Sequence, residues 1–213
     1  KSNMEKMVSF YNQQVDDFNG AKPLNPKVND FINVDPRNIS WTSSLILQLE
    51  KGNRAVFEQK KTARGLYRPF FKQNVYLGEK MIHRRGQMNE FFPTPSNKNF
   101  VICISGIGDS KNFTVIITDI IPDVQLQFNG QVFPLYYYEE RQKHTPGLFD
   151  ASGESEYTRR DGLSDFILDR AKKQYGKNVS KEDIFYYVYG FLHRPTYRTL
   201  FANDLKKMLP RLP

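Results

Sequence analysis

The chain of 213 residues contains 39% hydrophobic and 25% charged residues, which allows a folded core and excludes wholesale disorder. Its mean hydropathy is −0.61, and no apolar run approaches the ~18 residues that a membrane span needs, so we expect no membrane contact. No basic-then-apolar signal segment opens the chain, so we expect a cytoplasmic location. The single cysteine, Cys103, excludes a disulfide framework and a cysteine-based zinc site. Because the chain begins with Lys1 rather than methionine, we expect it to be part of a longer protein.

The N-terminal part of the chain predicts a helix. Apolar side chains recur at helical intervals from Met4 to Phe18, and Gly20 ends the pattern. Residues 19–40 read as a linker that carries prolines. Residues 43–51 predict a second, short helix.

From Ala55 to Tyr138 the apolar period changes to two, which is typical of strands. The apolar runs predict strands at residues 66–71, 75–77, 100–105 and 112–118. Residues 124–128 and 132–136 also alternate, and the Asn129-Gly130 dipeptide between them predicts a tight hairpin.

Residues 139–160 combine prolines, glycines and polar side chains, and we interpret them as an exposed loop. Helical patterns then return at residues 163–171, after a capping sequence at Ser180, and at residues 197–208. The predicted fold class is therefore α+β, with a central, mainly antiparallel sheet, an N-terminal helical segment and a C-terminal helical subdomain.

The net charge of +8 is not spread evenly. Residues 51–100 hold 11 basic and 3 acidic side chains, so this segment alone carries a charge equal to the whole excess. A local positive field of this kind attracts polyanions, among which nucleic acid is the commonest. A solvated basic face without a partner remains the alternative.

Two clusters in the basic segment have side chains suited to nucleic acid. Phosphate contacts are expected from Lys60, Lys61, Arg64, Arg68 and Lys72. Base readout is expected from Arg84, Arg85, Gln87 and Asn89, because Arg can fork to guanine while Gln or Asn can pair with adenine. The alternative for the second cluster is a polar loop. For the interleaved aromatic residues Tyr67, Phe70 and Phe71 we favour core packing over contact with a ligand.

The sequence contains none of the catalytic or cofactor-binding motifs that we searched for in complete form. Gly106-Ile107-Gly108 follows a predicted strand, but Lys111 stands where a dinucleotide fingerprint needs its third glycine. The three histidines lack any paired-ligand spacing, and turn formation explains Asp119 and Asp123 better than metal binding. We therefore expect no catalytic residue, no metal ligand and no cofactor in this chain.

Eight motifs occur in a fixed order. They are Tyr-Arg-Pro-Phe (67–70), Val-Tyr-Leu (75–77), Val-Ile-Cys-Ile-Ser-Gly-Ile-Gly (101–108), Thr-Asp-Ile-Ile-Pro-Asp (118–123), Gln-Val-Phe-Pro-Leu-Tyr-Tyr-Tyr-Glu (131–139), Asp-Gly-Leu-Ser-Asp-Phe (161–166), the run from Lys181 to Arg198 and the run from Phe201 to Arg211. Together they resemble the C-terminal specificity domain of Type ISP restriction–modification enzymes. These enzymes join a nuclease, a helicase-like motor, a coupler, an adenine methyltransferase and a target recognition domain in one polypeptide.

The resemblance implies a division of the chain. Residues 1–54 resemble a helical connector that follows the methyltransferase, residues 55–160 a β-rich recognition region, and residues 161–213 a C-terminal helical subdomain. It implies double-stranded DNA and the upstream methyltransferase and helicase domains as partners. S-adenosylmethionine, ATP and Mg²⁺ would belong to the parent enzyme and not to this part of it.

The resemblance also implies a role without turnover. The domain would recognise a DNA sequence, position the target adenine for methylation, and license translocation and cleavage by the upstream domains. The alternative is a coupling module that docks the methyltransferase to the motor and touches DNA only incidentally, for which the 14% aromatic content is suited.

Overall fold

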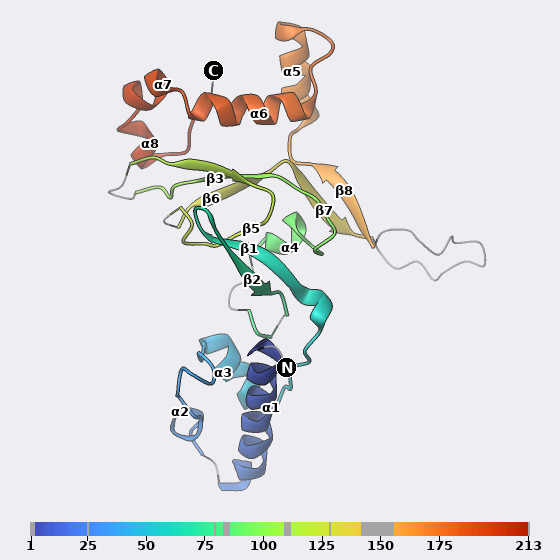
Figure 1. Cartoon of the computed structure of the whole chain (residues 1–213), viewed down its shortest axis with the longest axis vertical. Coiled ribbons are helices and arrows are strands. Elements are labelled where there is room, and N and C mark those ends of the chain that lie inside the picture. Colours follow the sequence, from blue (N-terminus) through green and yellow to red (C-terminus); the bar gives the residue numbers. More distant parts are fainter. Residues whose placement is uncertain are drawn as a thin grey trace, which may run out of the picture. The chain divides into compact units, whose positions relative to one another are not determined.

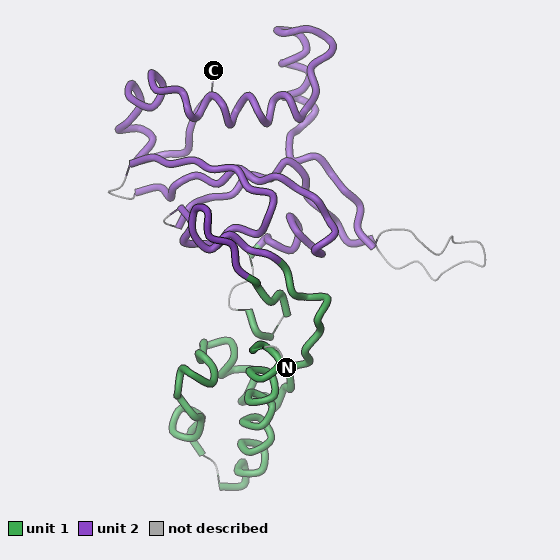
Figure 2. The backbone as a smooth tube through the Cα atoms, in the orientation of Figure 1, with its two compact units in different colours: residues 1–63, 74–86 green, residues 64–73, 87–213 purple. Residues whose placement is uncertain are grey.

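The chain divides into two units. The computed structural model describes residues 3–24, 26–78, 80–82, 86–108, 112–127, 129–141 and 156–212. Unit 1 comprises residues 1–63 and 74–86, and unit 2 comprises residues 64–73 and 87–213 (Figure 2). Helices and small mixed sheets build the chain (Figure 1), so the α+β class is confirmed. The functional division at residues 54 and 160 stays a prediction.

Unit 1 is mainly helical. Its helices are α1 (Asn3–Ala21), the 3-10 turn η1 (Lys22–Leu24), α2 (Val28–Phe31) and α3 (Ser43–Glu50). Helix α1 buries one stripe, from Val8 to Phe18, as its spacing predicts. The Thr42 side chain caps α3 by accepting a hydrogen bond from the Leu45 amide at 3.3 Å. Both predicted helices of this unit are confirmed.

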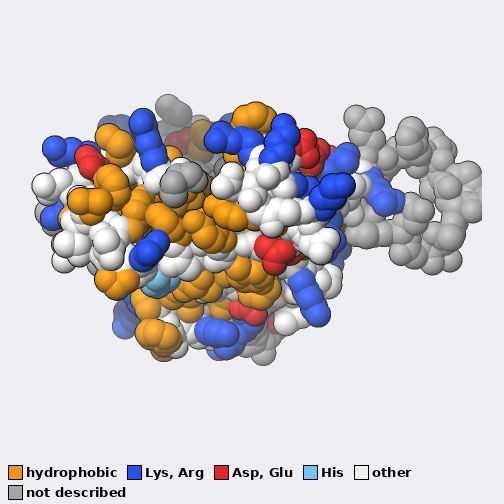
Figure 3. Space-filling view, turned by 90° about the horizontal axis from the view of Figure 1, so that it is seen from above, with side chains coloured by type: hydrophobic (Ala, Val, Ile, Leu, Met, Phe, Trp, Pro, Cys, Tyr) orange, Lys and Arg blue, Asp and Glu red, His pale blue; other side chains and the backbone are white. Residues whose placement is uncertain are grey.

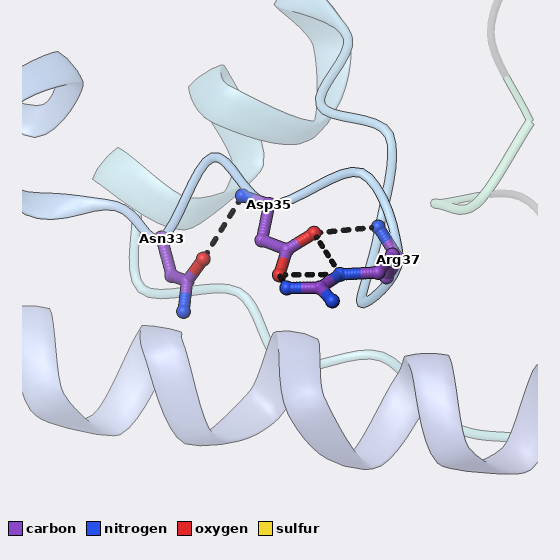
Figure 4. A network of polar contacts seen from close by, with 3 residues as sticks. All are labelled: Asn33, Asp35 and Arg37. Atoms are coloured by element: carbon purple, nitrogen blue, oxygen red, sulfur yellow. Dashed lines mark hydrogen bonds and ion pairs between the residues drawn. The ribbon is translucent and has the colours of Figure 1, made fainter.

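The prediction of a linker at residues 19–40 is wrong. Val28, Ile32 and Ile39 are buried in the same core as α1 and α3. Polar contacts order the turn between them (Figure 4), because Arg37 donates to both carboxylate oxygens of Asp35 and Asn33 accepts from the Asp35 amide. Prolines near the ends of this segment suggested an open chain, whereas Asx turns fold it back onto the core.

Three small sheets follow. The strands are β1 (Thr62–Arg68), β2 (Phe71–Tyr76), β3 (Val101–Ile104), β4 (Val115–Thr118), β5 (Ile121–Pro122), β6 (Gln131–Pro134), β7 (Tyr136–Glu140) and β8 (Tyr157–Asp161). Their orders are β2-β1-β5, β4-β3-β6 and β7-β8, with η2 (Gln59–Lys61) before β1 and α4 (Met88–Phe91) before β3. The pairing of β1 with β5 is parallel, and the other pairs with a described register are antiparallel.

The β4-β3-β6 sheet is the centre of unit 2. All four residues of β3 are buried, and Ile102 faces Ile117 on one neighbour and Phe133 on the other. Ile102 and Ile104 pack with Phe185 and Leu192 of α6 (Lys181–Leu192), which runs along one face of this sheet (Figure 1). The strands predicted at residues 100–105 and 112–118 are confirmed in shortened form.

The predicted hairpin across Asn129-Gly130 is wrong. Residues 124–127 form turns, and β6 pairs with β3 instead. Asp123 follows Pro122, and its carboxylate accepts a hydrogen bond from the Gln125 amide at 2.8 Å, which starts a turn in place of a strand. Leu126 and Gln127 are both buried, although strand alternation predicts opposite faces for them.

Short helices end the chain. They are α5 (Asp165–Tyr175), α6, α7 (Pro195–Leu200) and α8 (Asp204–Lys207). Ser180 and Asp183 form the predicted capping box of α6. The single helix predicted at residues 197–208 is divided in two, and the loop predicted at residues 139–160 includes β8, which pairs with β7. Within the described ranges, no helix is long and apolar enough to cross a membrane.

Candidate nucleic-acid interface

The β1–β2 hairpin carries three of the predicted phosphate contacts. Arg64 and Arg68 lie on β1 and Lys72 lies on β2, and all three are exposed. Arg64 stands between buried Ala63 and Gly65, so strand alternation turns its side chain to solvent. Residues 64–73 contain three basic residues and no acidic one.

The aromatic residues of this hairpin are not core residues, so our preferred interpretation of them is wrong. Phe70 is 97% exposed, Phe71 58% and Tyr67 38%. The pairing of β1 with β5 involves only Gly65 and Leu66, and the chain reverses beyond them at Pro69-Phe70. The hairpin tip therefore extends past the strand that covers its base. In the sequence, Pro69 indicates this turn, because proline favours the second position of a β-turn.

Two residues, Tyr67 and Asp123, orient the Arg68 guanidinium. It donates to the Tyr67 carbonyl at 2.8 Å, and its centre lies 4.0 Å from the centroid of the Tyr67 ring. The Asp123 carboxylate lies 3.7 Å from its Nη1. Arg68 is therefore oriented but partly neutralised, and Asp123 belongs to this surface although the sequence assigned it only to a turn.

Lys60 and Lys61 lie on η2 in unit 1. The Glu58 carboxylate lies 2.6 Å from the Lys61 ammonium and 3.5 Å from that of Lys60. The hydrogen bond from Lys61 and the charges of both lysines hold the pKa of Glu58 below its usual value. In the absence of DNA, these two lysines therefore share Glu58 as an anionic partner.

The base-readout candidates are placed only in part. Arg84 and Arg85 lie outside the described residues. Gln87 is exposed and precedes α4, whereas the side-chain oxygen of Asn89 is buried and has no hydrogen-bond partner within the described ranges.

Gln87 also lines a cavity of about 330 Å³ in unit 2. Cys103 and Val132 contribute apolar lining, while Asp123 and Gln131 contribute polar groups. The structure thus brings Gln87 to the same cavity as Asp123, the partner of Arg68. Gln131 lies 44 positions beyond Gln87 in the chain, so only the fold could reveal that both line this cavity.

Cys103 is one of the residues that line this cavity. Burial raises the pKa of its thiol to about 12, and the side chain is 2% exposed. An uncharged thiol is a poor nucleophile, so the Cys103 side chain serves as a small apolar residue of the core. Across the described ranges, His, Cys, Asp and Glu form no group of three that could hold a metal ion.

The sequence did not indicate the exposed face of the C-terminal helices. Figure 3 shows hydrophobic side chains gathered on this face, with Lys and Arg side chains at its margins. The exposed members include Phe166, Tyr187, Leu200, Phe201 and Met208. A shallow groove of about 520 Å³ beside Tyr187 and Phe191 contains His193, whose pKa is lowered by burial and by the nearby charge of Arg198.

Solved structures that resemble this chain include three complexes with DNA or a DNA mimic. The ATP-dependent Type ISP restriction–modification enzyme LlaBIII bound to DNA matches 99% of it with 30% identity and a TM-score of 0.79. The DrdV–DNA complex matches 97% with 27% identity and a TM-score of 0.76. A nuclease-deletion mutant of the Type ISP enzyme LlaGI, in complex with a DNA substrate mimic, matches 99% with 29% identity and a TM-score of 0.76.

The chain spans only a small part of these relatives, namely 12% of the LlaBIII chain, 18% of the DrdV chain and 14% of the LlaGI chain. A comparison with curated proteins finds no match. The family model of the Type ISP C-terminal specificity domain matches residues 1–213. This match confirms the resemblance carried by the eight motifs: the chain belongs to the family of Type ISP C-terminal specificity domains.

Proposed function

We propose that this chain recognises a specific sequence in double-stranded DNA. In the parent enzyme, this recognition would position the target adenine for methylation and, at unmodified sites, license ATP-driven translocation and cleavage by upstream domains. The domain itself would bind without turnover.

One observation carries the proposal. In a chain of this family, the β1–β2 hairpin presents exposed Arg64, Arg68 and Lys72 without an acidic residue in the same ten-residue segment. The solved relatives are DNA complexes, which favours duplex DNA over other polyanions. Cationic side chains of this kind position a protein on phosphates, while amides such as that of Gln87 can read base edges.

The cofactors of the proposed function lie outside this chain. We propose that S-adenosylmethionine, ATP and Mg²⁺ bind to the upstream methyltransferase and motor domains. The described residues offer no cluster of metal-ligating side chains, and the glycine pair at 106–108 lacks the third glycine of a dinucleotide site.

Selection from a randomised duplex library tests sequence recognition. The 213-residue chain should enrich one family of sequences over successive rounds of binding and amplification. Gln87→Ala should relax the preference at one position of that sequence, because a bidentate base contact contributes about 1–3 kcal/mol of discrimination. Gln174→Ala, a change of the same kind at an exposed position of α5, is the matched control. A library that remains random after selection by the wild-type chain would contradict the proposal.

A second candidate function is the docking of the methyltransferase to the motor. The exposed apolar face of the C-terminal helices favours it, because contiguous apolar surface marks protein contacts. Leu200→Asn together with Phe201→Asn should then impair binding to the separately produced upstream domains and leave selection of duplex DNA unchanged. If the double variant retains that binding, the face has another role.

A further inference from the structure

The tip of the β1–β2 hairpin has a feature that phosphate contacts do not explain. Phe70 is the most exposed large hydrophobic side chain in the part of the chain that the structure describes. Its backbone has a φ of +68°, in the left-handed region that bulky residues avoid. Such a conformation costs about 1–3 kcal/mol, and glycine or asparagine would adopt it more easily. A phenylalanine here improves neither packing nor backbone energy.

The surroundings of Phe70 hold it apart from other rings. The Tyr67 and Phe71 rings contact each other edge to face at 6.3 Å, and the Arg68 guanidinium covers the Tyr67 ring. The base of the tip is fixed, because Gly65 and Leu66 are buried against β5 and the Asp123 amide donates to the Leu66 carbonyl at 3.0 Å. The hairpin therefore presents one unpartnered aromatic ring from a supported ribbon.

We propose that Phe70 is a wedge that enters the base stack of duplex DNA, with Arg64, Arg68 and Lys72 on the flanking phosphates. The inference rests on the proposed function and adds how the DNA is deformed. The charge of the hairpin favours DNA over a protein partner, because three exposed cationic side chains lie in the same ten-residue segment as the exposed ring. Apolar wedges that partly unstack a base step and kink the duplex are a recurrent means of DNA binding.

A wedge predicts a preference for DNA that is already unstacked. We would measure the affinity of the 213-residue chain for a matched duplex and for the same duplex with one central T·T mismatch. The wild-type chain should bind the mismatched duplex more tightly, because part of the unstacking cost has been removed. Phe70→Asn should weaken binding to the matched duplex about tenfold, as expected for loss of an aromatic stacking contact, and abolish the preference.

The variants are chosen to keep the fold. Asn tolerates a positive φ, so Phe70→Asn should leave the thermal unfolding midpoint unchanged or raise it. Phe70→Trp should retain the preference for the mismatch. Tyr175→Asn removes another exposed ring, 72% exposed on α5, and should alter neither affinity.

The outcomes separate the two proposals. If the wild-type chain binds neither duplex, the proposed function fails for this chain and the wedge fails with it. If it binds both, and Phe70→Asn has the same affinities as the wild type, DNA binding stands and the wedge is overturned. In that case, the ring would be assigned to a contact with another protein.

Discussion

Asp123 sets how much of the positive charge of Arg68 is available to a ligand. The two side chains are 46% and 36% exposed and 3.7 Å apart, so their attraction contributes at most about 1 kcal/mol. Asp123→Asn keeps the oxygen that accepts from the Gln125 amide and removes the charge. We expect stability to change by less than about 1 kcal/mol and affinity for duplex DNA to rise about two- to fivefold.

Asp119→Asn is the control for this prediction. It removes the same charge from an exposed position of the neighbouring turn, without the contact to Arg68. Filter binding at low salt would compare the two variants with the wild type. An equal gain in affinity for both would show that net charge, rather than release of Arg68, is responsible.

Cys103 provides a second test at the scale of one residue. With a pKa of about 12 and an exposed fraction of 2%, the thiol is neither ionised nor accessible in the folded chain. At about pH 8 only about one thiol in ten thousand would be ionised. We expect Ellman's reagent to leave the native chain unmodified and to label one thiol per chain in guanidinium. Fast labelling of native protein would contradict the burial of β3.

At the scale of elements, the capping box of α6 links stability to pH. Ser180 accepts a hydrogen bond from the Asp183 amide at 3.1 Å, and the Asp183 carboxylate accepts from Ser180 in return. These hydrogen bonds lower the pKa of Asp183. Because the pKa is lower in the folded state, the stabilisation is present above the unfolded pKa and is lost as the pH falls through the folded one.

Ser180→Ala should therefore destabilise α6 by about 1 kcal/mol at neutral pH, and by less below the lowered pKa of Asp183. Hydrogen exchange of the amides of residues 181–192 would measure the change. Ser164→Ala is the comparison, because the Ser164 side chain caps α5 by accepting a hydrogen bond from the Ile167 amide. Its effect should show no such dependence on acid. A pH-independent effect of Ser180→Ala would exclude the contribution of Asp183.

Elements with strong local signals were predictable and those that depend on distant partners were not. Helix α1, the capped helix α6 and the buried strands β3 and β4 follow from spacing and composition alone. The alternation at residues 124–128 failed because the Asx turn at Asp123 and the pairing of β6 with β3 outcompete a local hairpin. The prediction that Phe70 packs in the core failed for a related reason. Its exposure depends on β5 being only two residues long, so that β5 does not cover the tip of the hairpin.

The candidate site was predictable in charge but not in geometry. The sequence identified the basic segment and its clusters, and the structure places Arg64, Arg68 and Lys72 together on one hairpin. Lys60 and Lys61 share Glu58 in the other unit. Asp123 lies beside Arg68 because β1 pairs in parallel with β5. This pairing joins residues more than 50 positions apart. No local pattern carries that information.

At the scale of the whole molecule, the positive charge is divided between the units. By sequence each unit carries a net charge of +4, and in unit 2 the ten residues 64–73 supply three of these charges. Residues 101–160, which follow in the same unit, are net −3. Residues 161–213 of the same unit are net +4, so the hairpin is one of two positive segments of unit 2. It differs from the other in charge density, because its three cationic residues fall within ten positions that contain no acidic residue.

Salt dependence tests whether the cationic side chains of the hairpin contact phosphates. Each phosphate neutralised by a Lys or Arg releases condensed counterions, so the logarithm of affinity falls with the logarithm of salt concentration by about 0.9 per contact. Lys72→Gln should reduce the magnitude of that slope by about 0.9, because its exposed ammonium lies on the hairpin. Lys177→Gln removes an equal charge from the exposed turn after α5 and should lower affinity slightly without changing the slope. Equal changes of slope for the two variants would mean that DNA responds to the net charge of the chain, and the hairpin would lose its assigned place at the interface.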